Sequence, residues 1–162
     1  MSEFNKAALL NSAKRINVSY FKEQQEDAIN AIWQWWQSSS ITFTLSGYAG
    51  TGKTFIMRHL VRYLITEKVC VTAPTHKALR VLENSSGRKG MTIQSLCGLR
   101  PDVDIEDYNI ENPSFKVIGE QKMRSYKLVI VDECSMVNPG LFTLLVKTAS
   151  QCRCKLLFLG EM

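Results

Sequence analysis

The chain has 162 residues, a length typical of one domain, with 45% hydrophobic and 22% charged residues as in ordinary soluble globular proteins. No apolar run reaches the roughly eighteen residues of a membrane span, and Met1–Phe4 do not open a secretory signal, so we expect a cytoplasmic protein without a membrane partner. The net charge of +5 is compatible with a polyanionic partner but does not by itself indicate one.

The first half of the chain predicts alternating helices and strands. Apolar residues recur at helical spacing over 21–37, and residues 41–46 are rich in β-branched and aromatic side chains, as in a strand. A second helix is predicted over 53–66 and a buried strand over 69–73. A third helix follows over 76–84, before a polar, glycine-bearing turn.

The second half contains an insertion between core elements. Residues 101–115 are acidic, polar and bracketed by prolines, so we expect an inserted hairpin over about 101–118. The core resumes with a strand over 127–131, a helix over 139–149 and a last strand over 155–159. Because helices alternate with continuously apolar strands, we expect an α/β fold with a parallel sheet covered by helices on both faces.

The five cysteines do not form a metal-binding pattern. Their number is odd, and the only closely spaced pair is Cys152 and Cys154. A structural zinc site would need a second pair or nearby histidines, which these positions lack. We therefore expect reduced thiols that serve mostly as packing residues.

A glycine-rich loop, here called the P-loop, lies between the first strand and the second helix. It consists of Gly47, Tyr48, Ala49, Gly50, Thr51, Gly52, Lys53 and Thr54. In the pattern G-x-x-x-x-G-K-[ST], glycines let backbone N–H groups wrap phosphates, the lysine reaches the β and γ phosphates, and the hydroxyl coordinates Mg²⁺. A strand before the loop and a helix opening at Lys53 favour this interpretation over a glycine turn that binds nothing. We expect ATP or GTP, with Mg²⁺ held by Thr54.

An acidic pair follows the apolar strand at 128–131. We expect Asp132 to hold the magnesium through water, and Glu133 to polarise the attacking water as a general base. With Lys53, these two residues form the expected catalytic set. The alternative is a solvated acidic pair at a strand end, which is common where no P-loop lies upstream. An Asp-Glu pair favours ATP hydrolysis over phosphoryl transfer between metabolites.

These motifs resemble superfamily-one DNA helicases of the RecD/Dda-like branch, in the family's order over residues 21–162. The P-loop is similar to the family's G-x-A-G-T-G-K-T, and Asp132–Met136 to its D-E-x-S-M motif. Gln25 resembles the glutamine that reads the adenine edge, in a segment that departs from L-T-x-x-Q-x-x-A at its first two positions. The alternative for Gln25 is a solvated side chain on a helix.

Residues 73–78, Ala-Pro-Thr-His-Lys-Ala, resemble the family's motif Ia, which contacts single-stranded DNA. A hydroxyl and helix-start N–H groups can grip a phosphate, and an imidazole can stack on a base. The resemblance therefore implies DNA contacts at Pro74, Thr75 and His76. The alternative is an N-capped helix in which Thr75 is the cap and His76 is solvated.

Three further segments resemble the family with departures. Thr92 opens a segment similar to T-x-H-S-L and is a candidate DNA contact, although Gln94 replaces the usual histidine. Residues 160–162 resemble the start of a G-D-x-x-Q segment, with Glu161 in place of aspartate. The insertion sits where the family carries a strand-separating pin, but its acidity suits a solvated loop. Contact of Phe115 with a duplex end and packing of its ring against the hairpin base both stay open.

The resemblance implies a first RecA-like ATPase domain over 21–162, preceded by an N-terminal segment over 1–20. The family's second RecA-like domain supplies arginines that stabilise the transferring phosphate, and part of the DNA track. Because the sequence ends directly after a core strand, we expect a truncated polypeptide that lacks the second domain. We expect it to bind nucleotide weakly, to hydrolyse it slowly and not to unwind DNA. The resemblance alone implies 5′ to 3′ translocation on single-stranded DNA by the parent protein.

Two other functions compete with the helicase. A P-loop ATPase of another kind would bind ATP without DNA dependence, and it leaves the Ala-Pro-Thr-His run unexplained. A non-catalytic single-strand-binding module would have a vestigial nucleotide site. The intact set of Lys53, Thr54, Asp132 and Glu133 argues against such decay.

Overall fold

The computed structural model describes residues 23–48, 50–63, 68–101, 115–117 and 119–160. The elements in chain order are α2 (Glu23–Gln37), β1 (Thr42–Ser46), α3 (Lys53–Tyr63), β2 (Val69–Ala73), α4 (His76–Ser86), β3 (Met91–Thr92), α5 (Ile93–Cys97), β4 (Leu99–Pro101), β5 (Phe115–Val117), η1 (Lys122–Ser125), β6 (Leu128–Val131), η2 (Cys134–Met136), α6 (Pro139–Cys152) and β7 (Lys155–Gly160). Across these ranges no helix is long and apolar enough to cross a membrane.

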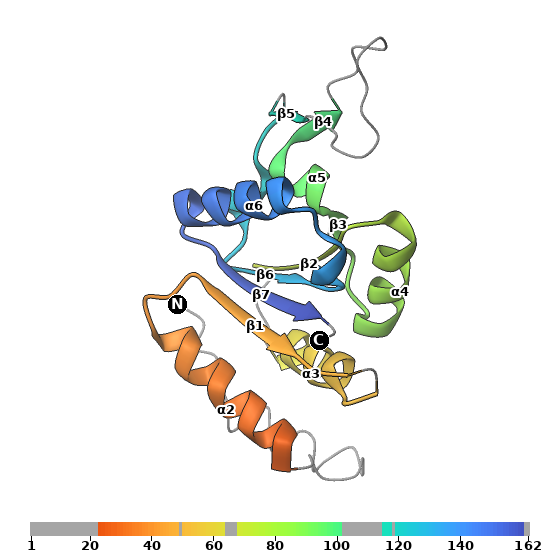
Figure 1. The fold of residues 1–162 in the computed structure, drawn as a ribbon, viewed down its shortest axis with the longest axis vertical. Helices are drawn as coiled ribbons and strands as arrows, with labels where there is room; N and C mark the ends of the chain where they lie inside the picture. Colours follow the sequence, from red (N-terminus) through yellow and green to blue (C-terminus); the bar gives the residue numbers. More distant parts are fainter. Residues whose placement is uncertain (1–22, 49, 64–67, 102–114, 118, 161–162) are drawn as a thin grey trace.

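Five strands form one sheet in which every pairing is parallel. Their order is β1-β7-β6-β2-β3, so the chain passes from β1 over two positions to β2 and later returns through β6 and β7. Figure 1 shows α2, α3 and α4 on one side of the sheet and α5 and α6 on the other. The expected α/β fold, a parallel sheet with helices on both faces, is confirmed.

Alternate residues of the central strands supply two separate cores. Val71 and Ile130 join the core beneath α2, α3 and α4, whereas Val129 and Phe158 join the core beneath α5 and α6. Successive side chains of a strand point to opposite faces, so a strand covered on both faces has to be apolar almost throughout. This explains why β2 and β6 read as nearly continuous apolar runs, with every residue buried.

Two helices run slightly further than their sequence pattern predicts, and each ends on a left-handed residue. Helix α4 continues to Ser86, where Gly87 has φ 70° and its N–H bonds the carbonyl of Glu83. Helix α6 continues to Cys152, and Arg153 has φ 53°. A left-handed residue that closes the last turn is a common helix stop. Helix α3 is described to Tyr63, so the rest of its expected range lies outside the described residues.

The short pair β3 and α5 is absent from the sequence prediction. Strand β3 has two residues, which pair with Thr72 and Ala73 of β2. Gly90 permits this approach, because a Cβ there would lie 2.3 Å from the carbonyl oxygen of Val71. A two-residue strand has no periodicity of its own, so only its partner determines it.

The insertion begins and ends on an antiparallel pair. Strand β4 pairs with β5, with Pro101 opposite Phe115. Residues 102–114 and 118 lie outside the described residues, as do the side chains of Pro101 and Phe115. The role of this insertion and both alternatives for Phe115 therefore stay open.

Candidate nucleotide site and DNA-facing edge

The carboxyl ends of the parallel strands meet at one edge of the sheet. Strand β1 leads into the P-loop, β6 into Asp132, and β2 into Pro74. Strand β3 ends at Thr92, whose register partner is Ala73. In open α/β sheets, ligands bind outside the carboxyl ends of the strands. The fold thus brings the two halves of the expected nucleotide site and the expected DNA contacts to the same edge.

The P-loop adopts a backbone that its glycines permit. Gly50 has φ 78° and Gly52 has φ 94°, conformations that other residues adopt only with strain. The hydroxyl of Thr51 donates to the carbonyl of Tyr48 at 2.9 Å and closes the loop on itself. Ala49, also expected to contact the nucleotide, lies outside the described residues.

Lys53 and Thr54 open α3 directly after the loop. The Lys53 ammonium donates to the carbonyl oxygens of Gly47 and Tyr48, the latter at 2.9 Å, so this charge lies within the curve of the loop. Helical bonding starts with the N–H of Ile56 to the carbonyl of Gly52. The N–H groups before it belong to the positive end of the helix, where anions bind well. Thr54 is exposed at this end. These features fit a bound phosphate chain.

Gln25 reaches the P-loop from α2. Its side-chain amide donates to the carbonyl of Thr51 at 3.3 Å. A Cβ added to Gly52 would lie 2.2 Å from Gln25 Nε2, so the glutamine passes directly over the loop. The sequence expectation placed this residue at the nucleotide, and the contact locates it at the P-loop. Its role toward adenine stays a proposal.

Asp132 continues β6 by one hydrogen bond, from its N–H to the carbonyl of Thr72 at 3.0 Å. Its carboxylate accepts from the N–H of Glu133 at 3.0 Å. Burial raises the pKa of this carboxyl above its usual range, while the Glu133 N–H and the positive charge of Lys53 oppose that rise. The influence of Lys53 on Asp132 shows that the two halves of the expected site share one electrostatic environment.

Glu133 begins a sharp turn after β6. It is exposed and has φ 51° and ψ 42°, a left-handed conformation that is uncommon for a side chain of this type. The turn places η2 against the end of β7, since a Cβ on Gly160 would lie 2.6 Å from the Cys134 sulfur. The Glu133 side chain is therefore exposed to solvent directly beside Asp132.

The candidate DNA contacts Thr75 and Thr92 are both helix caps. Thr75 Oγ1 accepts from the N–H of Ala78 at 3.1 Å, and His76 is exposed. Thr92 Oγ1 accepts from the N–H of Ser95 at 3.3 Å. The cap and the DNA contact are compatible, because a capping hydroxyl accepts one hydrogen bond and keeps its own hydrogen to donate. Pro74, half-buried, precedes the first of these caps.

Thr72 is a buried residue that the sequence analysis did not single out. Its hydroxyl donates to the carbonyl of Met91 at 2.6 Å, and its own carbonyl accepts from the N–H of Asp132. It therefore ties β3 and the start of the acidic turn to β2. The only signal in the sequence is one polar residue within an apolar strand.

The described residues hold no group of three or more histidine, cysteine or acidic side chains suited to a metal ion. Magnesium commonly binds through one or two protein ligands together with substrate phosphates. Thr54 and Asp132 therefore match the donor set of a magnesium that is held largely by the nucleotide.

The cysteines are free thiols, and three of them are buried. Burial raises the pKa of Cys70 and of Cys97 to about 11, and that of Cys154 to about 12. A thiol with such a pKa is almost entirely protonated at neutral pH and is a poor nucleophile. These cysteines act as packing residues of the core beneath α5 and α6.

A family model described as an AAA domain matches residues 20–162. The chain belongs to the AAA domain family. This AAA domain is 31% identical over 129 residues to the ATP-dependent DNA helicase dda of Enterobacteria phage T4, covering 78% of this chain and 28% of the relative. It is 31% identical over 142 residues to an uncharacterized protein of Acanthamoeba polyphaga mimivirus, covering 77% of this chain and 29% of that protein. The expected kinship with RecD/Dda-like helicases is confirmed.

A solved structure shares the fold of this AAA domain. The Pif1 helicase from Candida albicans aligns with a TM-score of 0.58 and 24% identity, over 86% of this chain and 32% of the helicase. The chain thus spans under a third of the length of these relatives.

Proposed function

We propose that the chain is the ATP-binding first motor domain of an ATP-dependent DNA helicase. The observation that carries the proposal is the gathering of Gln25, Lys53 and Asp132 from three separate elements at one edge of the sheet. The relatives named as ATP-dependent DNA helicases support it. We place such a protein in the cytoplasm, or in the host cytoplasm if a phage encodes it.

Each residue of the site has a distinct task in this proposal. The Lys53 ammonium exchanges its loop carbonyls for the β and γ phosphates, where it neutralises negative charge. Thr54 and Asp132 would hold Mg²⁺, which would supply positive charge that stabilises the phosphate groups. Glu133 orients the attacking water and accepts its proton. Gln25 recognises the edge of the adenine above the P-loop.

The DNA contacts lie beside the nucleotide site. Thr92 ends β3 and Thr75 follows the end of the neighbouring strand β2, and their hydroxyl hydrogens would donate to phosphate oxygens of a bound strand. His76 is exposed and can stack on a base. We propose single-stranded DNA as the partner, with translocation 5′ to 3′ as the helicase resemblance implies. Opening and closing of a cleft against a second RecA-like domain would move this grip along the strand.

The nucleotide part of the proposal is tested with Lys53→Ala. Loss of the ammonium should weaken binding of Mg²⁺-ATP about a hundredfold or more, because two charge-assisted contacts disappear. The measurement is calorimetric titration of the purified chain. Lys122→Ala, at an exposed position of η1, is the matched control. Equal affinities of Lys53→Ala and the wild type would refute the site.

The helicase part of the proposal concerns a longer protein that would contain this chain together with a second motor domain, here called the longer protein. We expect residues 1–162 alone to hydrolyse ATP slowly if at all, because the arginines of a second motor domain typically contribute about a thousandfold or more. A polypeptide that includes that domain should hydrolyse ATP faster when single-stranded DNA is added. Robust ATPase activity of residues 1–162 that responds to DNA would contradict the need for a second domain. ATPase activity of the longer protein without any response to DNA would favour an ATPase of another kind.

A further inference from the structure

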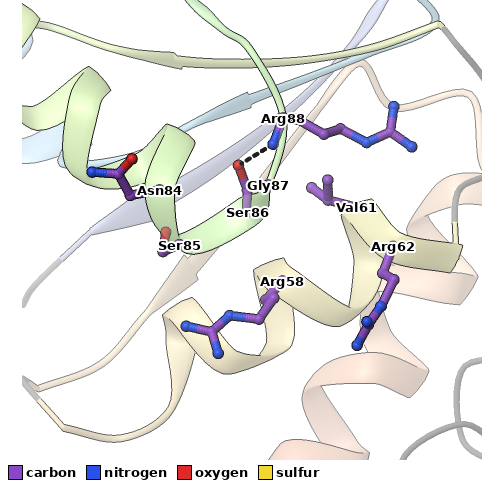
Figure 2. A pocket seen from close by; sticks show the side chains of 8 residues that line it. All are labelled: Arg58, Val61, Arg62, Asn84, Ser85, Ser86, Gly87 and Arg88. Atoms are coloured by element: carbon purple, nitrogen blue, oxygen red, sulfur yellow. Dashed lines mark hydrogen bonds between the residues drawn. The ribbon is translucent and has the colours of Figure 1, made fainter.

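A pocket of about 570 Å³ lies between the second halves of α3 and α4, as Figure 2 shows. It is lined by Arg58, Val61, Arg62, Asn84, Ser85, Ser86, Gly87 and Arg88. We call this the arginine pocket. Among the lining residues that the structure describes, three are arginines and none is acidic, and the function proposed above assigns the pocket no role.

The arginine pocket lies away from the nucleotide edge. Helices α3 and α4 both begin at the carboxyl edge of the sheet, at Lys53 and His76, and the pocket is formed by their far ends. Arg58 and Arg62 are five and nine residues along α3 from Lys53, which at 1.5 Å per residue is about 8 and about 13 Å of helix. A partner in this pocket would therefore leave the P-loop and the expected DNA contacts accessible.

The side chains of the pocket suit carboxylates. A guanidinium presents a rigid fork of donors that matches a carboxylate with two parallel hydrogen bonds. Arg58 and Arg62 are exposed and four residues apart, so they project from the same face of α3. Val61, fully buried, supplies an apolar wall next to them.

The guanidinium groups do not converge on one point. In Figure 2 those of Arg58, Arg62 and Arg88 extend in different directions from the pocket wall. This arrangement suits several separate negative charges along an extended chain better than one small anion.

A peptide fits this lining better than a nucleic acid strand does. The described lining residues include no aromatic side chain, whereas single-strand sites usually stack bases on aromatic rings. The exposed Asn84 amide adds an acceptor beside the arginine donors. A peptide backbone can use both kinds of group, whereas the sugar-phosphate backbone of DNA has no hydrogen-bond donors.

We propose that the arginine pocket binds an acidic peptide segment of a partner protein, with two carboxylates paired to Arg58 and Arg62. The site works as a docking point that is independent of ATP binding at the P-loop. This proposal rests on the proposed motor function and adds to it a second binding surface, at the far ends of α3 and α4.

The test uses a fluorescein-labelled peptide of eight alternating aspartate and leucine residues, with binding to the purified chain followed by fluorescence anisotropy. The double variant Arg58→Glu/Arg62→Glu should bind the peptide at least about tenfold more weakly, because charge-assisted bonds become repulsion. The control Arg124→Glu/Lys147→Glu carries the same charge change at exposed positions outside the pocket and should bind as the wild type does. Thermal melting verifies that both variants fold, and calorimetric titration verifies that both still bind Mg²⁺-ATP.

Three results would overturn the proposal. If peptide binding is weakened equally in both double variants, the peptide is held by the overall positive charge of the chain and not by the arginine pocket. Unchanged peptide binding with weaker binding of an oligothymidylate strand would mean a nucleic acid site. Loss of self-association in sedimentation runs, without any loss of peptide binding, would mean that the pocket meets a second copy of this chain. Failure of ATP binding in the wild-type chain would instead refute the proposed function and leave this test unaffected.

Discussion

The ammonium of Lys155 donates to the carbonyl oxygen of Trp35 at 2.8 Å and lies 4.8 Å from the centre of its indole ring. The same ammonium donates to the carbonyls of Ser38 and Ser40 at 2.8 and 2.9 Å. Lys155 opens β7, whereas the Trp35 carbonyl lies in the last turn of α2 and the two serine carbonyls follow it, so one cation holds this helix to the sheet. The opposite end of α2 carries Gln25 over the P-loop. A cation at a helix C-terminus is stabilising because it meets the negative end of the macrodipole.

We predict that Lys155→Met destabilises the chain by about 1–3 kcal/mol, since three carbonyls lose a charged donor while the aliphatic stem is kept. The measurement is the free energy of unfolding in urea. Lys147→Met, at an exposed position on α6, should change it by less than about 0.5 kcal/mol. If both variants unfold at the same urea concentration, the hydrogen bonds of the Lys155 ammonium contribute nothing to the free energy of unfolding.

Much of this fold could be predicted because its signals are local. The apolar runs of β2 and β6 report burial on both faces, and the glycines of the P-loop report the left-handed backbone found at Gly50 and Gly52. Other features depend on residues far apart in the chain. The bond from Lys155 to Trp35 spans 120 residues, and the two-residue β3 exists through its pairing with β2 and the Thr72 hydroxyl. No window of sequence contains such a pairing.

The candidate site likewise has some features that short sequence patterns predict and others that they do not. Lys53, Asp132 and Glu133 were assigned from short patterns, and the structure places them at one edge of the sheet. The turn at Glu133 carries no such signal, because nothing in Asp-Glu-Cys-Ser predicts a left-handed glutamate. The turn brings Cys134 close to Gly160, a contact between residues far apart in the chain.

We predict that Gly52→Ala impairs nucleotide binding and destabilises the chain by about 1–3 kcal/mol. The alanine would combine a positive φ with a Cβ that lies 2.2 Å from Gln25 Nε2, so the glutamine has to leave the loop. Gly87→Ala is the matched control, because its φ is also positive, at 70°, and its Cβ would meet nothing within 4 Å. Urea unfolding and ATP titration of both variants separate backbone strain from the clash. Equal ATP affinities in the two variants would show that the Gln25 contact is unimportant.

We predict that Asp132→Asn stabilises the chain at neutral pH while it abolishes ATP hydrolysis in the longer protein. Burial raises the pKa of Asp132 in the folded state, so ionisation costs stability once the pH is above that pKa, and the cost disappears as the pH falls toward the ordinary value of 3.8. The stability gain of the asparagine variant over the wild type should therefore shrink between pH 7 and pH 4. Urea unfolding at both pH values measures it. A gain that grows on acidification would mean that Asp132 has a lowered pKa in the folded chain.

We predict that Thr75→Asp separates the two roles proposed for Thr75. Aspartate is as good an N-cap as threonine and suits the positive end of α4, so the free energy of unfolding should stay within about 0.5 kcal/mol of the wild type. Its negative charge should repel a phosphate at the same position and weaken binding of single-stranded DNA about tenfold. Thr75→Ala should behave differently, with a loss of about 1 kcal/mol in stability from the missing cap. If Thr75→Asp binds an oligothymidylate strand as tightly as the wild type does, Thr75 is a cap alone and the DNA track lies elsewhere on this edge.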